Sequence, residues 1–141
     1  MARAKIVLPE NFLFSTELTV RINEINYGGH LGNDSLLSLI QEARIKFLNK
    51  YGFTEQDIDG CGIIMADAVI IYKSQAFYGD ILNIEINIED LSKIACDVIY
   101  RISNKKTGKE IARAKTRIAF FDYSKNKTVK IPEKFKSIFN T

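Results

Sequence analysis

The sequence has few residues of the kinds that bind metals or form cross-links. Its 141 residues include one histidine, His30, and two cysteines, Cys61 and Cys96. The cysteines lie in apolar runs without a CxxC spacing, and a single histidine is too little to complete a zinc site with them. We therefore expect no metal site, no bound redox cofactor, and two buried, reduced thiols.

Long hydrophobic runs and a strong excess of one charge are also absent. No stretch approaches the roughly 18 apolar residues that a membrane span requires, and residues 1–12 lack the apolar segment of a signal peptide. Twenty Lys and Arg against 17 Asp and Glu leave a net charge of +3, far below the basic excess of a nucleic-acid-binding domain. We expect a cytoplasmic protein with no membrane or nucleic-acid partner.

The composition that remains is that of one ordinary folded domain. Apolar residues make up 46% and charged residues 26% of the chain, a balance typical of globular proteins. A chain of this length buries a core without disulfides or metal. Because no internal repeat or low-complexity segment divides it, we expect residues 1–141 to form a single domain.

Hydrophobic periodicity predicts a strand followed by a long helix. Residues 15–22 alternate between apolar and polar side chains, as a half-buried strand does. Residues 34–50 carry apolar residues at helical spacing. Asn33 or Asp34 is the candidate cap at the start of this helix, and Gly52 is the candidate terminator.

The second half of the chain predicts strands. Residues 62–74 are almost all apolar, which favours a strand covered on both faces. Residues 81–122 contain three alternating segments separated by short turns, which predicts an antiparallel meander. Pro132 can open a short final helix.

This order of elements predicts an α+β fold, because it has no alternation of strands and helices. We expect a curved, five-stranded antiparallel sheet wrapped around the long central helix. One helix covers only one face of such a sheet, and an edge strand stays unpaired. A dimer, or a dimer of dimers, would remove that edge.

Three motifs in register resemble the hotdog-fold thioesterases, in particular the 4-hydroxybenzoyl-CoA thioesterase-like group. The motifs are the loop Asn26-Tyr27-Gly28-Gly29-His30-Leu31-Gly32-Asn33, the helix segment Glu42-Ala43-Arg44, and the strand "IIYKSQAFYGDIL" at residues 70–82. The resemblance covers most of residues 15–123. It implies a hotdog fold, a homodimer or homotetramer with sites between subunits, and hydrolysis of an acyl-CoA thioester.

The loop departs from the family at one position. Many members of the family carry a catalytic Asp four residues before the histidine, where this chain has Asn26. A carboxylate can take a proton from water or attack a carbonyl, whereas an amide only orients water or substrate through hydrogen bonds. Asn26 is therefore either a turn residue or a residue that positions water or the thioester carbonyl, and catalysis needs another base.

The loop otherwise suits a thioester. A helix start offers free N–H groups and a positive dipole end, and glycines let the backbone approach a carbonyl closely. We expect the N–H groups near Gly29 and His30 to polarise the carbonyl. His30 itself is either a packed histidine or a group that positions the loop or donates to substrate or water. The expected substrate-binding residues are Tyr27, Gly28, Gly29, Leu31, Gly32 and Asn33.

Two acids are candidates for the missing base. Glu42 lies on the long helix, and other hotdog thioesterases use a helix carboxylate; its alternative role is an exposed ion pair with Lys46. Asp67 interrupts an apolar strand, where burial would raise the pKa of a general base, and plant acyl-ACP thioesterases use an acid in a comparable region. Its alternative role is to pair with Lys73, Arg44 or a backbone group.

Other residues are candidates for contacts with the rest of an acyl-CoA. Basic residues that can surround the phosphates are Lys73, Lys93, Lys105, Lys106, Arg113, Lys115 and Arg117. Tyr72, Phe77 and Tyr78 either line an acyl tunnel or belong to the core. We therefore expect an acyl-CoA thioesterase-like enzyme. The alternatives are a non-catalytic acyl-thioester binding protein and a hotdog dehydratase or hydratase.

Overall fold

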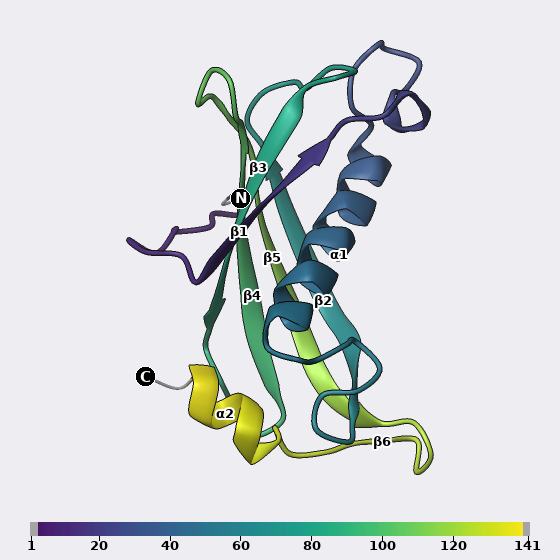
Figure 1. Cartoon of the computed structure of the whole chain (residues 1–141), viewed down its shortest axis with the longest axis vertical. Helices are drawn as coiled ribbons and strands as arrows, with labels where there is room; N and C mark the ends of the chain where they lie inside the picture. Colours follow the sequence, from purple (N-terminus) through teal and green to yellow (C-terminus); the bar gives the residue numbers. More distant parts are fainter. Residues whose placement is uncertain (1–2, 140–141) are drawn as a thin grey trace.

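The computed structural model describes residues 3–139 and has a long helix on one face of an antiparallel sheet (Figure 1). The elements in chain order are β1 (Phe14–Thr19), the 3-10 helix η1 (Ile22–Glu24), α1 (Asn33–Lys50), β2 (Gly62–Tyr72), β3 (Ile81–Glu89), β4 (Ala95–Asn104), β5 (Glu110–Asp122), β6 (Lys127–Thr128) and α2 (Glu133–Phe139). The predicted α+β class is therefore confirmed.

The strands form a single sheet in the order β1-β3-β4-β5-β2, and β6 pairs with β5. Pairing of β3 with β4 and of β4 with β5 is antiparallel, which confirms the predicted meander over residues 81–122. In the described part of the chain the sheet has six strands, where we expected five. The missed strand is two exposed residues long, too short to produce a hydrophobic period.

The core lies between α1 and the face of the sheet that it covers. The strand positions that alternate along β3, Leu82, Ile84, Ile86 and Ile88, are all buried. The apolar side of α1 meets them with Leu36, Leu39, Ile40, Ala43 and Phe47. Burial of each such side chain stabilises the fold by about 1.5–3 kcal/mol relative to exposure, so this contact fixes α1 on the sheet.

Two glycines mark the ends of α1. The helix begins at Asn33 with Gly32 as its N-cap, so the prediction that Asn33 or Asp34 caps it is wrong. Gly32 already has an extended backbone, with φ −69° and ψ 146°, which leaves Asn33 and Asp34 inside the first turn. At the other end Gly52 has φ +81°, a conformation that glycine adopts without steric cost, and it ends the helix as predicted.

Strand β2 lies at the edge of the sheet and not in its interior. It pairs with β5 alone, and its residues 64–68 are exposed, including Ile64 and Met65 at 41% and 42%. The expectation that both faces of this strand are covered is therefore wrong for the single chain. An apolar run reports hydrophobicity, but the position of a strand in the sheet is set by pairing with distant segments.

The two cysteines are free thiols in different environments. Cys96 is buried in β4, as expected, whereas Cys61 is only half-buried before β2. Within residues 3–139 no helix is both long enough and apolar enough to span a membrane.

Candidate active site

The glycine-histidine loop folds as a very tight hairpin between Ile25 and Leu31. The N–H of Asn26 donates to the carbonyl of His30 at 2.9 Å, and the N–H of Gly29 donates to the carbonyl of Asn26 at 3.0 Å. Gly29 has φ +80°, the left-handed conformation that commonly closes a three-residue hairpin loop. The local sequence therefore fixes Asn26 and His30 opposite each other.

The side chain of Asn26 is held within this turn. Its Oδ1 accepts a hydrogen bond of 2.9 Å from the N–H of Gly28. The side-chain amide still has its N–H donors, and no acceptor for them is found among residues 3–139. Asn26 is thus a turn residue, while its second predicted role, to position water or the thioester carbonyl through its free N–H groups, stays a prediction.

His30 is half-buried at the end of the hairpin. Its Nδ1 lies 3.3 Å from the carbonyl oxygen of Leu31. A proton on Nδ1 makes this contact a hydrogen bond and leaves Nε2 as an acceptor. Gly28 makes room for the ring, because a Cβ at Gly28 would lie 3.1 Å from Nε2.

Neighbouring segments fasten the loop on both sides. The N–H of Leu31 donates to the carbonyl of Ala76 at 2.8 Å, and the N–H of Gly32 donates to the carbonyl of Glu24 at 2.9 Å. The Glu24 carboxylate is buried, accepts the N–H of Arg21 at 2.7 Å and pairs with its guanidinium. Glu24 is a residue that the sequence did not single out, and it anchors the entry to the site.

The helix start provides free donors, although not the pair that we expected. The N–H of Gly29 donates to the carbonyl of Asn26 within the turn, so it is not a free donor. The N–H groups of His30 and Asn33 have no acceptor within residues 3–139. Both lie at the positive end of α1, where N–H groups and the helix dipole favour a negatively charged oxygen.

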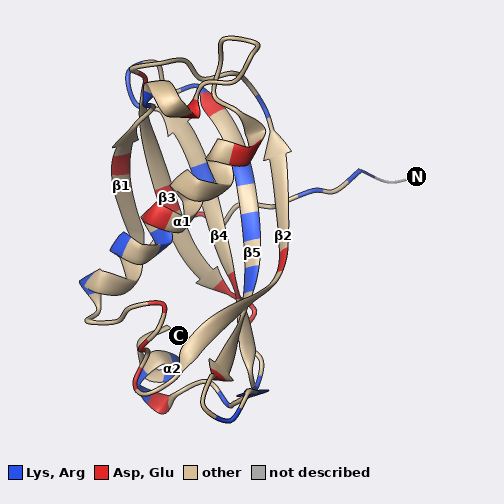
Figure 2. Ribbon diagram, turned by 90° about the vertical axis from the view of Figure 1, so that its right-hand side faces the viewer, with Lys and Arg blue, Asp and Glu red and all other residues tan. Residues whose placement is uncertain are grey.

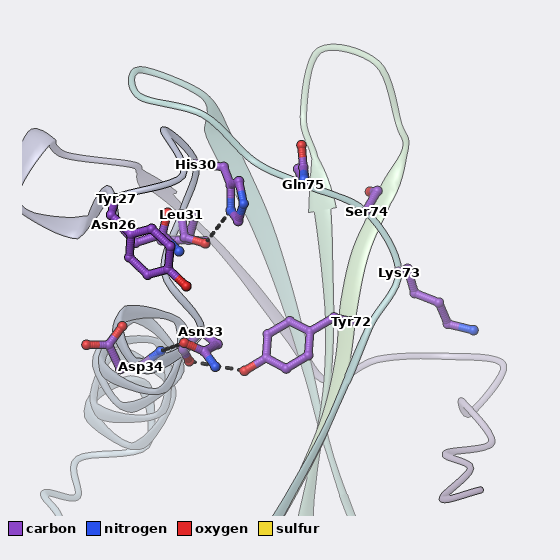
Figure 3. A pocket seen from close by; sticks show the side chains of 10 residues that line it. All are labelled: Asn26, Tyr27, His30, Leu31, Asn33, Asp34, Tyr72, Lys73, Ser74 and Gln75. Atoms are coloured by element: carbon purple, nitrogen blue, oxygen red, sulfur yellow. Dashed lines mark hydrogen bonds between the residues drawn. The ribbon is translucent and has the colours of Figure 1, made fainter.

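A cavity of about 700 Å³ opens between this loop, the first turn of α1 and the end of β2 (Figure 3). Its lining residues are Asn26, Tyr27, His30, Leu31, Asn33, Asp34, Tyr72, Lys73, Ser74 and Gln75. Tyr72 spans the gap, with its hydroxyl donating to the carbonyl of Asn33 at 3.1 Å. Burial raises the pKa of Tyr72, and the nearby charge of Asp34 raises this pKa further.

Most residues predicted for the site gather at this cavity. Asn26, Tyr27, His30, Leu31 and Asn33 line it, while the three glycines shape the loop behind them. Glu42 and Asp67 are not among the lining residues. Glu42 is half-buried farther along α1, and Asp67 is exposed in β2 next to the bulge that follows Met65.

Some of the other residues singled out in the sequence also line the cavity, and some do not. Tyr72 lines it, as one of its two predicted roles required, whereas Phe77 and Tyr78 do not and are 49% and 65% exposed. Asp34, Ser74 and Gln75 line the cavity and were missed. The signal for Asp34 was present, because it follows the loop directly, but we had assigned it only to capping.

Two basic residues of β5 that were candidates for binding CoA phosphates are engaged in ion pairs. Figure 2 shows positive residues along this strand, but Arg113 pairs with Glu110 and Arg117 pairs with Asp97 and Asp90. Lys73 is the one basic residue that lines the cavity, and it has no ion-pair partner within residues 3–139. The same range contains no group of three or more His, Cys, Asp or Glu placed to hold a metal.

The arrangement of sheet, long helix and loop defines a hotdog protein of the thioesterase type. Residues 20–139 match the family model of the thioesterase-like superfamily, and the chain belongs to that superfamily. A curated protein of Aquifex aeolicus with the name "Putative esterase" is 26% identical over 116 residues, which is 81% of this chain and 88% of that protein.

Solved structures share this fold. A 1,4-dihydroxy-2-naphthoyl-CoA thioesterase from Synechocystis superposes with a TM-score of 0.82 at 21% identity, covering 90% of this chain and 95% of its own. A DHNA-CoA thioesterase from Staphylococcus aureus has a TM-score of 0.78 at 21% identity, covering 89% of this chain and 85% of its own. At these identities the likeness shows the fold alone.

Proposed function

We propose that this protein hydrolyses the thioester of an acyl-CoA to the free acid and CoA, and that the whole chain is one catalytic domain. The observation that carries the proposal is the cavity at the start of α1, which is lined by Asn26, His30 and Asn33. The superfamily and its CoA thioesterases support the same reaction class.

The loop residues have separate roles in this reaction. The thioester carbonyl accepts hydrogen bonds from the backbone N–H groups of His30 and Asn33, which stabilise the oxyanion as water attacks. The side-chain amide of Asn26 donates to the same oxygen or to the water. Tyr27, Leu31 and the glycines at 28, 29 and 32 shape the walls against which the thioester lies.

The proton acceptor must be a group other than Asn26. Asn26 has no useful basicity, and neither Glu42 nor Asp67 lines the cavity of its own chain. Glu42 or Asp67 would serve as the base only where a second copy brought it to the site. Hydrolysis as such does not depend on which acid takes the proton.

We also propose that the protein forms a homo-oligomer. Strand β2 carries an unpaired edge with exposed apolar side chains, and its last residue, Tyr72, lines the cavity. Pairing of two such edges in a homodimer or homotetramer would cover them and place another chain beside the site. Light scattering coupled to size-exclusion chromatography tests this point, and a monomer at micromolar concentration would contradict it.

The test of hydrolysis is free-thiol release from a panel of short, medium, long and aryl acyl-CoAs. We expect turnover by the wild-type protein and a loss of at least about tenfold in His30→Ala, because the imidazole lies on the cavity wall. Circular dichroism must show that both proteins are folded. Release from no member of the panel would contradict the proposal.

One observation favours a second candidate, a non-catalytic acyl-thioester binding protein. The residue at the usual position of the catalytic Asp is Asn26, and its oxygen is engaged by Gly28. A binding protein needs the cavity and the donors but no base. Tight binding of an acyl-CoA without turnover, together with turnover created by Asn26→Asp, would establish this alternative.

A further inference from the structure

We propose that Asp34 supplies the carboxylate that the loop lacks at Asn26, and that it is the proton acceptor of the hydrolysis. This assignment rests on the thioester hydrolysis proposed above. Asp34 is the second residue of α1 and lines the same cavity as Asn26, His30 and Tyr72. Figure 3 places Asp34 on the side of the cavity that also carries Asn26 and Tyr27, opposite Tyr72 and Lys73.

Gly32 allows the Asp34 side chain to approach Asn26. A Cβ on Gly32 would lie 2.6 Å from Oδ1 of Asp34 and 3.5 Å from Cβ of Asn26, so these two atoms are at most about 6 Å apart. The carboxylate therefore occupies the space directly above the buried glycine, beside the Asn26 side chain. A carboxylate on either residue reaches the same part of the cavity, directly or through one water molecule.

The carboxylate of Asp34 has no hydrogen-bond or ion-pair partner among residues 3–139, whereas Glu24, the other acid beside the loop, is buried and occupied by Arg21. Its charge also acts across the cavity, since it raises the pKa of Tyr72 after the larger effect of burial. Asp34 is an exposed residue on the cavity wall, and a carboxylate without a partner can accept a proton from water.

The plain structural role of Asp34 is to complement the helix dipole. An acid in the first turn stabilises a helix by about 0.3–1 kcal/mol, and many first-turn acids do no more. Glu133 in the first turn of α2 is such an acid in the same chain, and it lies outside the cavity. It therefore provides a matched control for the loss of a first-turn charge.

The proposed step transfers one proton through Asp34. The water oxygen forms a bond to the thioester carbon, a water proton moves to the Asp34 carboxylate, and the carbonyl electron pair moves to its oxygen. When the tetrahedral intermediate collapses, the C–S bond breaks and Asp34 returns the proton to the CoA sulfur. The second proton of the water leaves with the acid product and passes to solvent.

The experiment compares four proteins on one acyl-CoA that the wild type hydrolyses: wild type, Asp34→Asn, Glu133→Gln, and the double variant Asn26→Asp/Asp34→Asn. We expect Asp34→Asn to lower kcat by about 100-fold or more with a smaller change in KM. Glu133→Gln should keep wild-type kinetics. The double variant should regain much of the lost kcat, because it returns a carboxylate to the same part of the cavity.

The rescue separates a base from a residue that only supports the helix. A helix defect caused by Asp34→Asn would appear in urea unfolding and would not be repaired by a change at Asn26. Near-wild-type kcat in Asp34→Asn, or a loss that the double variant does not restore, would overturn the assignment while leaving hydrolysis intact. A wild type that hydrolyses no acyl-CoA would instead end the proposed function and this assignment together.

Discussion

The hydroxyl of Tyr72 donates a hydrogen bond of 3.1 Å to the backbone carbonyl of Asn33. This bond joins the last residue of β2 to the first residue of α1 across the cavity. It holds the strand end and the helix start at a fixed separation, and it does so from a side chain that is 52% exposed. A single, partly solvated contact therefore links two walls of the cavity.

Tyr72→Phe removes this contact while keeping the ring. We expect a change in the free energy of unfolding below about 1 kcal/mol, because a partly exposed hydrogen bond contributes little net stability. KM for the acyl-CoA should rise several-fold, since the strand end and the helix start are no longer tied together. Urea unfolding and initial-rate kinetics measure the two effects, and unchanged KM would contradict the role of the contact.

Gly28→Ala tests the packing of His30 inside the loop. The added Cβ would lie 3.1 Å from His30 Nε2 and 3.3 Å from Asn26 Oδ1, closer than most Cβ contacts, so the imidazole must shift. We expect kcat/KM to fall by about tenfold or more, because small displacements at a reacting centre are costly. The free energy of unfolding should change by less than about 1 kcal/mol.

Gly108→Ala is a control that should lower stability and leave activity unchanged. Gly108 lies in the turn between β4 and β5 with φ +75°, and an added Cβ would meet no atom within 4 Å. The strained backbone should cost about 1 kcal/mol of stability, with kinetics unchanged. Equal activity losses in both glycine variants would show that the effect of Gly28→Ala is a general one.

The sequence predicted those parts of the fold that local periodicity determines. The alternation along residues 81–89 and the helical spacing after Asn33 each identify an element and its buried face, and both agree with the structure. The apolar run of β2 led to the wrong prediction that both faces of this strand are covered, because edge and central strands can have the same composition. Pairing with residues far along the chain decides between them.

The same distinction applies to the site. The loop was recognisable because its turn chemistry is local, and Asn26, Gly28 and His30 contact one another. Asp34 was missed as a cavity residue because its approach to Asn26 depends on the missing side chain of Gly32. The partners of Arg44 were also not predicted, since Glu55 lies in the loop after α1 and Tyr100 lies 56 residues farther along the chain than Arg44.

Arg44→Met tests this buried network. The guanidinium is buried, pairs with Glu55 and donates to the hydroxyl of Tyr100 at 3.0 Å, and that hydroxyl contacts Thr116 at 2.8 Å. Removing the cation leaves the Glu55 charge without its ion-pair partner and removes one of the two hydrogen bonds of the Tyr100 hydroxyl. We expect a loss of about 3–5 kcal/mol in the free energy of unfolding by urea.

The double variant Arg44→Met/Tyr100→Phe checks the mechanism of that loss. Because both substitutions break the same hydrogen bond between Arg44 and Tyr100, the double variant should lose less stability than the two single variants added together. Strict additivity would show that the two side chains do not act as one network.

Lys73→Ala tests recognition of the CoA phosphates. Lys73 borders the site cavity and also lines a second cavity of about 640 Å³ with Arg3 and Lys5, and Figure 3 shows its side chain extending away from His30. We expect KM to rise several-fold for an acyl-CoA and to stay constant for the matching acyl-pantetheine, which lacks the nucleotide phosphates. Lys136→Ala, on α2, is the control for a lost surface charge, and a KM increase with both substrates would contradict this role.

The two thiols should differ sharply in reactivity. Burial raises the pKa of Cys96 from 9.0 to about 12 and also raises the pKa of the half-buried Cys61. A higher pKa leaves less thiolate at any given pH, and the thiolate is the species that attacks a disulfide reagent. In folded protein at pH 8, Ellman's reagent should label Cys61 slowly and Cys96 only after unfolding. Rapid labelling of two thiols per native chain at pH 8 would contradict the buried position of Cys96.

The raised pKa of Cys96 also makes stability depend on pH. Since Cys96 is protonated in the folded chain up to a higher pH than in the unfolded chain, its contribution to stability is complete below pH 9 and declines as the pH rises towards 12.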